Sequence, residues 1–175
     1  MNKYKILEGQ YVEVCGKKLY RVQALKDFDG VKAGDTGGYI ESESNLSQYD
    51  NAWVYDDAQV YGNAWVSGDA QVYGNAWVSG DARVYGNARV CGNAWVSGTR
   101  HYLNLGPIGS RDGYTTIYRD KNKKAIVVCG CFLGSLDKFE RAVHKTHAGA
   151  NYEAEYMVLI QLARLREKEW LDETD

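Results

Sequence analysis

Eight consecutive six-residue units occupy the middle of this chain, from position 51 to position 98. They read NAWVYD, DAQVYG, NAWVSG, DAQVYG, NAWVSG, DARVYG, NARVCG and NAWVSG. Alanine is second and valine fourth in every unit, so small and β-branched apolar residues recur with one fixed period. Because so short a unit cannot bury its apolar side chains alone, it must stack on its neighbours, and this repeat predicts a solenoid.

Turn residues recur at one phase of the same units. Each unit begins with Asn or Asp, and most units end with Gly. Gly and Asn tolerate positive φ, which a short strand needs where the chain turns a corner. We therefore expect short strands that point Ala and Val inward and are separated by tight corners. A ninth, degenerate unit, NLSQYD at 45–50, precedes the regular ones.

The array resembles the hexapeptide-repeat family of left-handed β-helices. It carries that family's pattern of an aliphatic residue followed four positions later by a small one, as in Val66 with Ala70 and Val78 with Ala82. Three hexapeptides form one triangular coil in that family, so the resemblance implies three coils over 45–98. The left-handed sense of the expected helix also comes from the resemblance.

Coils of three units would stack each residue on the residue three units earlier. The alternation of the units then places unlike residues side by side, which avoids like-charge pairs between neighbouring strands. The expected outward columns are Trp53 under Gln71 and Arg89, Trp65 under Arg83, and Trp77 under Trp95. At the corners, Asp69 should lie between Asn51 and Asn87, and Asp81 should lie above Asn63.

The flanking segments predict a cap and a second small domain. Alternation over 11–22, with turn chemistry near Gly16, predicts a β-hairpin that caps the first coil. Strand-like segments at 101–105, 114–119 and 125–132, followed by helices that start near Ser135 and Asn151, predict an α+β unit. The fold class is thus mainly β: a short left-handed parallel β-helix with an N-terminal β-hairpin cap and a small C-terminal α+β domain. The expected domains are 1–44, 45–98 and 99–175.

Both flanking segments also resemble uncharacterised proteins of phages and prophages. The entry segment AGDTGGYIESESNLS resembles the start of their hexapeptide arrays, and the stretch that begins GPIGSRDGYTT resembles a tail found on such proteins. The resemblance implies a phage or prophage origin, and it implies no known chemistry for the tail.

Composition excludes several classes of protein. The formal net charge is -2 and no basic stripe is present, so we expect no long nucleic acid as a partner. No segment is apolar for long enough to span a membrane or to act as a secretion signal, which predicts a location in the bacterial cytoplasm. Four scattered cysteines are expected to be free thiols, and no cofactor is expected.

The best-known hexapeptide-family members are acyltransferases that use a histidine base. This array contains no histidine, because the three histidines are His101, His144 and His147. The family's catalytic residue therefore has no matching position here. We expect no catalytic residues, and acyl transfer is kept as the enzymatic alternative.

The glycine-rich loop at 106–113 is the most site-like segment. Its glycines can expose backbone N–H groups, and Ser110 and Arg111 are suited to a phosphate or carboxylate. Thr116 and Arg119 on the following strand could extend this polar surface. The alternative is an ordinary glycine-rich turn with a solvated arginine.

Cys129 and Cys131 are expected to place both sulfurs on one face of a single strand, with His147 near in sequence. We favour a core role for these thiols over a metal site, so no metal ligand is predicted. His147 itself is retained as a candidate ligand-binding residue.

Outward aromatic residues are the strongest functional hint in the array. Monomers rarely expose such surfaces, so self-association is expected, and the family resemblance implies a homotrimer. Packing under the flanking segments is the competing explanation. Clefts between subunits would present aromatic and arginine side chains, which suit a nucleobase and its phosphate. The array residues included in the candidate ligand site are Trp77, Trp95, Arg83 and Arg89.

These features together predict a non-catalytic, oligomeric binding protein. We expect it to sequester a small anionic, nucleotide-like ligand and thereby to counter host defence. A structural or protein-binding phage protein and a hexapeptide-type acyltransferase are the alternatives.

Overall fold

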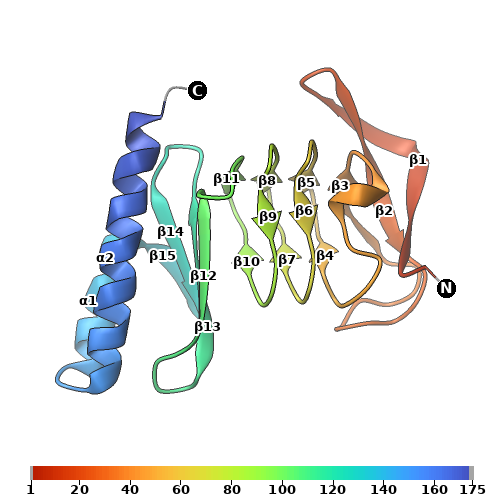
Figure 1. Ribbon diagram of the computed structural model, residues 1–175. Helices are drawn as coiled ribbons and strands as arrows, with labels where there is room; N and C mark the ends of the chain where they lie inside the picture. The colour runs from red at the N-terminus through yellow and green to blue at the C-terminus, as the bar shows by residue number, and fades with distance from the viewer. Residues whose placement is uncertain (1, 174–175) are drawn as a thin grey trace. The chain divides into compact units, whose positions relative to one another are not determined.

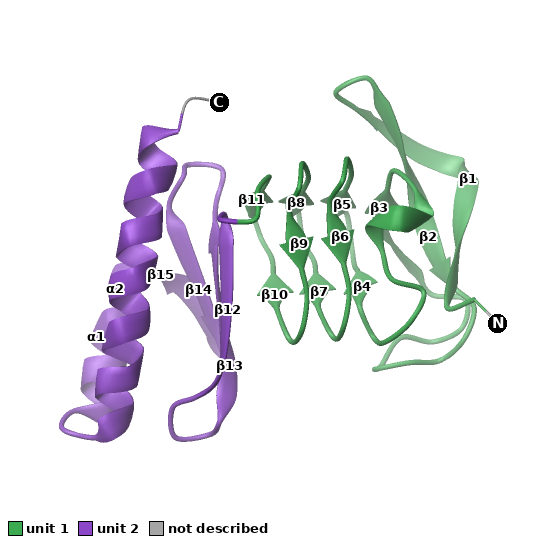
Figure 2. Cartoon of the chain, viewed as in Figure 1, with its two compact units in different colours: residues 1–99 green, residues 100–175 purple. Residues whose placement is uncertain are grey.

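The computed structural model describes residues 2–173, and the chain divides into two compact units, 1–99 and 100–175 (Figure 2). The N-terminal segment and the repeat array form the first unit. The α+β segment forms the second.

The repeats form a parallel β-helix with three strands in each coil (Figure 1). Partner residues in neighbouring coils lie three units apart, as in Trp53 with Gln71 and Trp65 with Arg83. This register confirms the predicted columns, including Arg89 beside Gln71 and Trp95 beside Trp77. The strands are β4 (Trp53–Val54), β5 (Gln59–Val60), β6 (Trp65–Val66), β7 (Gln71–Val72), β8 (Trp77–Val78), β9 (Arg83–Val84), β10 (Arg89–Val90) and β11 (Trp95–Val96).

Alanine and valine fill the interior of the helix, as predicted. Every alanine and every valine of the eight units is buried. Full burial of one valine side chain stabilises a fold by roughly 1.5–3 kcal/mol, so a column of valines holds each coil on the next. Backbone hydrogen bonds run between coils along the same columns, from Trp53 N to Ala70 O and from Tyr55 N to Val72 O.

Most corners alternate Asn with Asp between coils. The side-chain amide of Asn51 donates to Asp69 at 2.9 Å, and that of Asn63 donates to Asp81 at 3.0 Å, as the predicted stacking requires. Asp56 adopts a φ of 53° at a corner where the next coil carries Gly74, and its carboxylate accepts a hydrogen bond from the Gly74 N–H at 3.0 Å. At this corner, where glycine is absent, the carboxylate of Asp56 stabilises the backbone with positive φ.

The first coil begins earlier than predicted, and the phase expected for 45–50 is wrong. Strand β3 (Thr36–Ile40) pairs in parallel with β5 and sets Ile40 beside Val60. Leu46 forms a bridge with Val66, so Leu46 takes the place that valine holds in the later units. The reason is a two-residue insertion: Leu46 follows Ile40 by six positions but precedes Val54 by eight.

An N-terminal hairpin extends the sheet that contains β3. Strands β1 (Tyr4–Val14) and β2 (Lys17–Ala24) pair antiparallel, and Cys15 and Gly16 between them both have positive φ. Strand β2 then pairs with β3, which confirms the predicted cap. A short 3-10 helix, η1 (Glu43–Asn45), follows β3.

The cap changes the surface expected for the array. Trp53 is only 1% exposed, because its ring packs against Tyr4 and Phe28 at centroid distances of 6.1 and 5.3 Å. The expectation that it faces outward on an open surface is therefore wrong. Trp65 and Trp95, which the cap does not cover, are 41% and 37% exposed.

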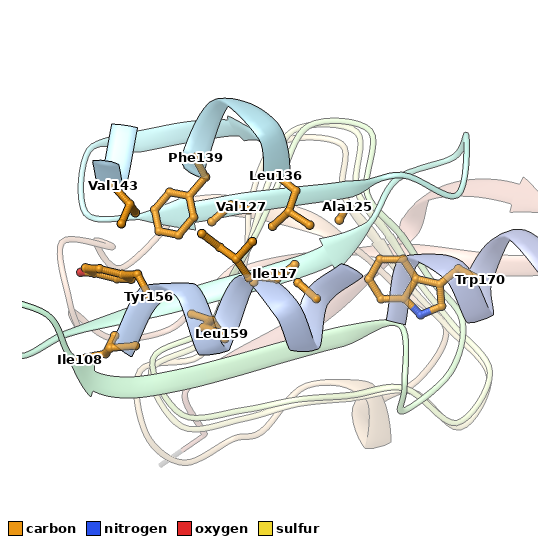
Figure 3. Close-up of a cluster of buried hydrophobic side chains, with 12 residues drawn as sticks. Ile108, Ile117, Ala125, Val127, Leu136, Phe139, Val143, Tyr156, Leu159 and Trp170 are labelled. Atoms are coloured by element: carbon orange, nitrogen blue, oxygen red, sulfur yellow. The ribbon is translucent and has the colours of Figure 1, made fainter. Parts of the chain in front are cut away.

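The second unit is a four-stranded antiparallel sheet with two helices on one face (Figure 1). A single apolar cluster joins the helices to the sheet, with Ile117 and Val127 from strands and Phe139, Leu159 and Trp170 from helices (Figure 3). This confirms the predicted α+β class. The elements are β12 (Tyr102–Ile108), β13 (Gly113–Arg119), β14 (Ala125–Cys129), β15 (Phe132–Ser135), α1 (Leu136–His147) and α2 (Asn151–Asp172).

Two local expectations in this unit are wrong. The strand predicted over 125–132 is interrupted, because Gly130 adopts a φ of 57° and forms a tight turn with Cys131. Cys129 and Cys131 therefore do not share one face of one strand. Helix α2 starts at Asn151, so its N-cap position is Ala150; Ser135 does hold the N-cap position of α1, without a side-chain capping hydrogen bond.

A candidate ligand cavity in the C-terminal unit

A cavity of about 300 Å³ lies where two loops of the second unit meet the end of helix α1. The β12–β13 loop contributes Ser110 and Arg111, and the β14–β15 turn contributes Cys131. The end of α1 contributes Thr146 and His147. Ser110, Arg111 and His147, which were predicted separately from sequence, are thus brought to one place.

Aromatic rings form the inner wall of this cavity. Phe132 packs on Phe139 at a centroid distance of 5.1 Å, and Phe139 meets Tyr156 edge-on at 5.5 Å. His147 lies over Tyr156 at 5.6 Å with an angle of 31° between the rings. Figure 3 shows Phe139, Val143, Tyr156 and Ile108 together at one end of the apolar cluster, so the wall is the end of the core itself.

The glycine-rich loop already binds a carboxylate of the same chain. The N–H of Gly109 donates to Glu155 at 3.0 Å, with Gly109 at a φ of 73°. A Cβ at this position would collide with the hydroxyl of Tyr156, so close approach of the loop to α2 requires glycine. One backbone N–H of the loop is therefore already occupied by a carboxylate of this chain. Ser110 and Arg111 are exposed at the rim of the cavity.

The hydroxyl of Tyr156 is held in a poorly solvated position. Burial raises the pKa of Tyr156 above its usual range, and the nearby Cys129 thiol raises it further. The Cys129 sulfur lies 3.7 Å from that hydroxyl and accepts a hydrogen bond from Thr115 at 3.2 Å. Tyr156 therefore stays neutral and keeps a proton that it can donate at the cavity wall.

Two predicted residues lie away from the cavity. Thr116 is 2% exposed and donates to Asn104 at 3.0 Å. Arg119, at the far end of β13 from the loop, is 3% exposed and binds the Glu173 carboxylate at 2.9 Å. His101 also binds Glu173, at 2.8 Å. Neither Thr116 nor Arg119 lines the cavity.

The predicted array residues belong to the other unit. Trp77 and Trp95 pack together at a centroid distance of 5.9 Å on one face of the β-helix. Arg83 stacks on Trp65 in register on a second face, and Arg89 continues the column of Trp53 and Gln71 on the third. The candidate residues therefore belong to two different units of the chain.

Sequence reasoning missed the aromatic wall as part of a site. Phe139 and Tyr156 lie on the helix faces that pack into the core, so their sequence pattern indicates only a core role. Tyr114 also lines the cavity and directly follows the glycine-rich loop. An aromatic residue beside that loop was the available signal for a binding surface.

Comparison with known proteins identifies the repeat. A family described as the YdcK beta solenoid repeat matches residues 58–70, 70–83 and 82–98. The array is a hexapeptide-repeat β-solenoid. The chain is also similar to an Escherichia coli K12 protein called uncharacterized acetyltransferase YdcK, with 41% identity over 63 residues. That match covers 32% of this chain and 19% of the relative, so the chain spans less than a fifth of the length of the relative it matches.

Residues 2–173 contain neither a metal-binding cluster nor a membrane-spanning helix. No cluster of three or more His, Cys, Asp or Glu side chains in this described part could hold a metal ion. None of its helices combines the length and the apolar character needed to span a membrane.

Proposed function

We propose that this solenoid protein is a non-catalytic binding protein that takes up a small anionic ligand in the cavity of its second unit. The observation that carries the proposal is the convergence of Ser110, Arg111 and His147 around one cavity with an aromatic wall. An apolar pocket with a few polar groups at its edge is the usual form of a small-molecule site.

The charge at the cavity favours an anion. Arg111 and His147 are the basic side chains that line it, and no Asp or Glu is among the lining residues. An arginine presents several donors in a fixed plane that matches phosphate and carboxylate groups. Nucleotides combine such a group with an aromatic ring, so a nucleotide-like ligand is the leading candidate.

Equilibrium titration calorimetry with a panel of nucleotides and simple anions tests this function. We expect at least one nucleotide to bind, and Arg111→Ala to weaken it. Arg141→Ala is the matched control, since it removes the same charge from an exposed position of α1 that does not line the cavity. Equal weakening by both variants, or no binding across the panel, would contradict the proposal.

The biological setting is a further part of the proposal. The resemblance of the flanks to phage and prophage proteins supports a role in countering host defence by sequestration in the bacterial cytoplasm. Exposed Trp65 and Trp95 support self-association through the solenoid faces, with a trimer expected from the resemblance. Native mass spectrometry would test self-association and sequestration together, since it reports the number of subunits and any retained ligand.

Acetyl transfer is the second candidate, and the name of the E. coli relative favours it. The repeat array that the family model matches contains no histidine in this chain. The alternative predicts binding of acetyl-CoA and turnover that falls in His147→Ala. Absence of acetyl transfer to a panel of amine and hydroxyl acceptors would remove it.

A further inference from the structure

The cavity has two surfaces of different chemistry, and they suit two different parts of one ligand. The inner surface is made of buried rings and aliphatic side chains, including Phe139, Val143 and Tyr156. The rim carries exposed Ser110 and Arg111. We infer that the cavity encloses a planar ring of its ligand while the anionic group stays at the rim beside Arg111. This inference rests on the proposed function and names the ligand class: small anions that carry an aromatic ring.

The inner wall is suited to a ring because it is itself a series of rings. Phe132, Phe139, Tyr156 and His147 follow one another at centroid distances of 5.1 to 5.6 Å. A planar ligand ring placed against them buries apolar area and gains aromatic contacts, and stacking of one base on aromatic side chains strengthens binding by roughly 5- to 150-fold.

The cavity is large enough for the ring of the ligand but not for the whole ligand. Small-molecule sites run from about 300 to 1,000 Å³, and this cavity, at about 300 Å³, is at the lower end. It can therefore enclose one ring system, while a sugar and phosphate would extend past Arg111 into solvent.

The charge distribution points the same way. A phosphate placed against Phe139 and Val143 would lose its hydration beside apolar side chains, which is strongly unfavourable. At the rim it keeps water and meets the Arg111 guanidinium, but an exposed ion pair contributes little because water screens it. The ring should therefore supply most of the affinity, and the charge should supply a smaller share.

Tyr156 provides one polar contact inside. Its hydroxyl lies 3.7 Å from the Cys129 sulfur, which is a weak acceptor, so the proton can turn toward a ring nitrogen or carbonyl of the ligand. This contact would favour heteroaromatic rings over purely hydrocarbon ones.

The experiment compares three related compounds on the intact protein: adenosine 5′-monophosphate, adenosine and ribose 5-phosphate. We expect ribose 5-phosphate to bind at least about tenfold more weakly than the nucleotide, and adenosine to stay within about tenfold of it. Arg111→Ala should weaken the nucleotide and leave adenosine unchanged. Ligand-observed NMR should show stronger saturation transfer to the ring protons than to the ribose protons.

A cavity-filling variant supplies a second test. Ala142 lines the cavity, so Ala142→Phe should exclude the ring and abolish nucleotide binding. Ala154→Phe, at an exposed position of α2 outside the lining, is the matched control and should bind normally. Thermal unfolding of both variants shows whether either has lost its fold.

The outcomes separate the two proposals. If ribose 5-phosphate binds as tightly as the nucleotide, the anion-binding function stands and the ring inference is overturned. If nucleotides and other ring-bearing anions, such as phenylacetate, all fail to bind, both are overturned. Preferential binding of ring-bearing compounds that Ala142→Phe removes would support both.

Discussion

The ammonium of Lys3 donates a hydrogen bond of 2.7 Å to the carbonyl oxygen of Ala52, 49 positions along the chain, at the start of the first regular unit. It also donates to the carbonyl of Tyr49 at 3.2 Å and lies 5.2 Å from the centre of the Phe28 ring. The side chain is fully buried. The N-terminal segment is therefore tied to the solenoid by a cation that has lost its water.

This burial predicts an unusual pH dependence of stability. Burial lowers the pKa of Lys3 from 10.5 to about 8, with nearby Asp50 opposing and Lys26 adding to the shift. Between these pH values the unfolded chain binds more protons than the folded one, so Lys3 contributes stability that rises with pH across this window.

Urea unfolding of the wild type and of Lys3→Met at pH 7.5 and 9.5 measures this contribution. We expect the wild type to gain on the order of 1–2 kcal/mol relative to the variant over that interval. The difference cancels the opposing effect of Tyr4, whose pKa burial raises. Parallel pH profiles for the two proteins would show that the Lys3 ammonium is solvated.

The glycine corners predict two different costs for one substitution. Gly80 and Gly92 both have positive φ, at 57° and 64°, so alanine at either is strained by about 1–2 kcal/mol. A Cβ on Gly80 would also collide with the carbonyl oxygen of Ser97 in the next coil, whereas nothing lies within 4 Å at Gly92. Gly80→Ala should therefore lower the free energy of unfolding, measured by chemical denaturation, by about 1–3 kcal/mol more than Gly92→Ala does. Equal losses would mean that the coils can move apart.

The Asn–Asp pairs at the corners predict a salt-dependent loss of thermal stability in one variant. Asn51→Asp would place a carboxylate against Asp69, 2.9 Å from the present amide nitrogen, and like charges on neighbouring strands destabilise a sheet. We expect a lower melting temperature at low ionic strength that recovers in high salt. Asn93→Asp is the control, because the residue one coil below it is Asn75. A loss that salt does not reverse would point to the lost hydrogen bond rather than to charge.

The end of α2 predicts a contrast between two carboxylates. Glu173 binds buried Arg119, whereas Glu169 pairs with exposed Arg100. Glu173→Gln should lower the free energy of unfolding by about 1–3 kcal/mol, because it weakens a hydrogen bond to a buried charge. Glu169→Gln should cost less than about 1 kcal/mol, as exposed pairs do. Similar values for the two variants would argue that Glu173 is solvated.

Local periodicity was enough to predict the solenoid, and its columns followed from the three units per coil that the family resemblance implies. A period of six with three units per coil leaves one register, and Trp77 beside Trp95 follows from it directly. The burial of Trp53 was not predictable in the same way, because the residues that cover it, Tyr4 and Phe28, come from a segment with no repeat. The first coil was placed in the wrong phase because an insertion hides the spacing between Leu46 and Val54.

The candidate site was predictable in part for the same reason. The local composition of the loop singled out Ser110 and Arg111. Their meeting with His147 depends on the packing of α1 and α2 on the sheet, and no short-range pattern encodes that contact. Arg119 shares the strand that follows the loop, yet β13 carries it to the far end, where Glu173 binds it.

The insertion between Leu46 and Val54 gives the solenoid a fixed origin. In a uniform array a slip by one coil would restore nearly every pairing, so the starting point would be poorly determined. Ile40 and Leu46 reach Val60 and Val66 only through the longer first coil, and no later coil offers the same spacing. The insertion thus fixes which unit pairs with which. Every copy of the chain therefore presents its columns of tryptophan and arginine at the same positions along the solenoid axis.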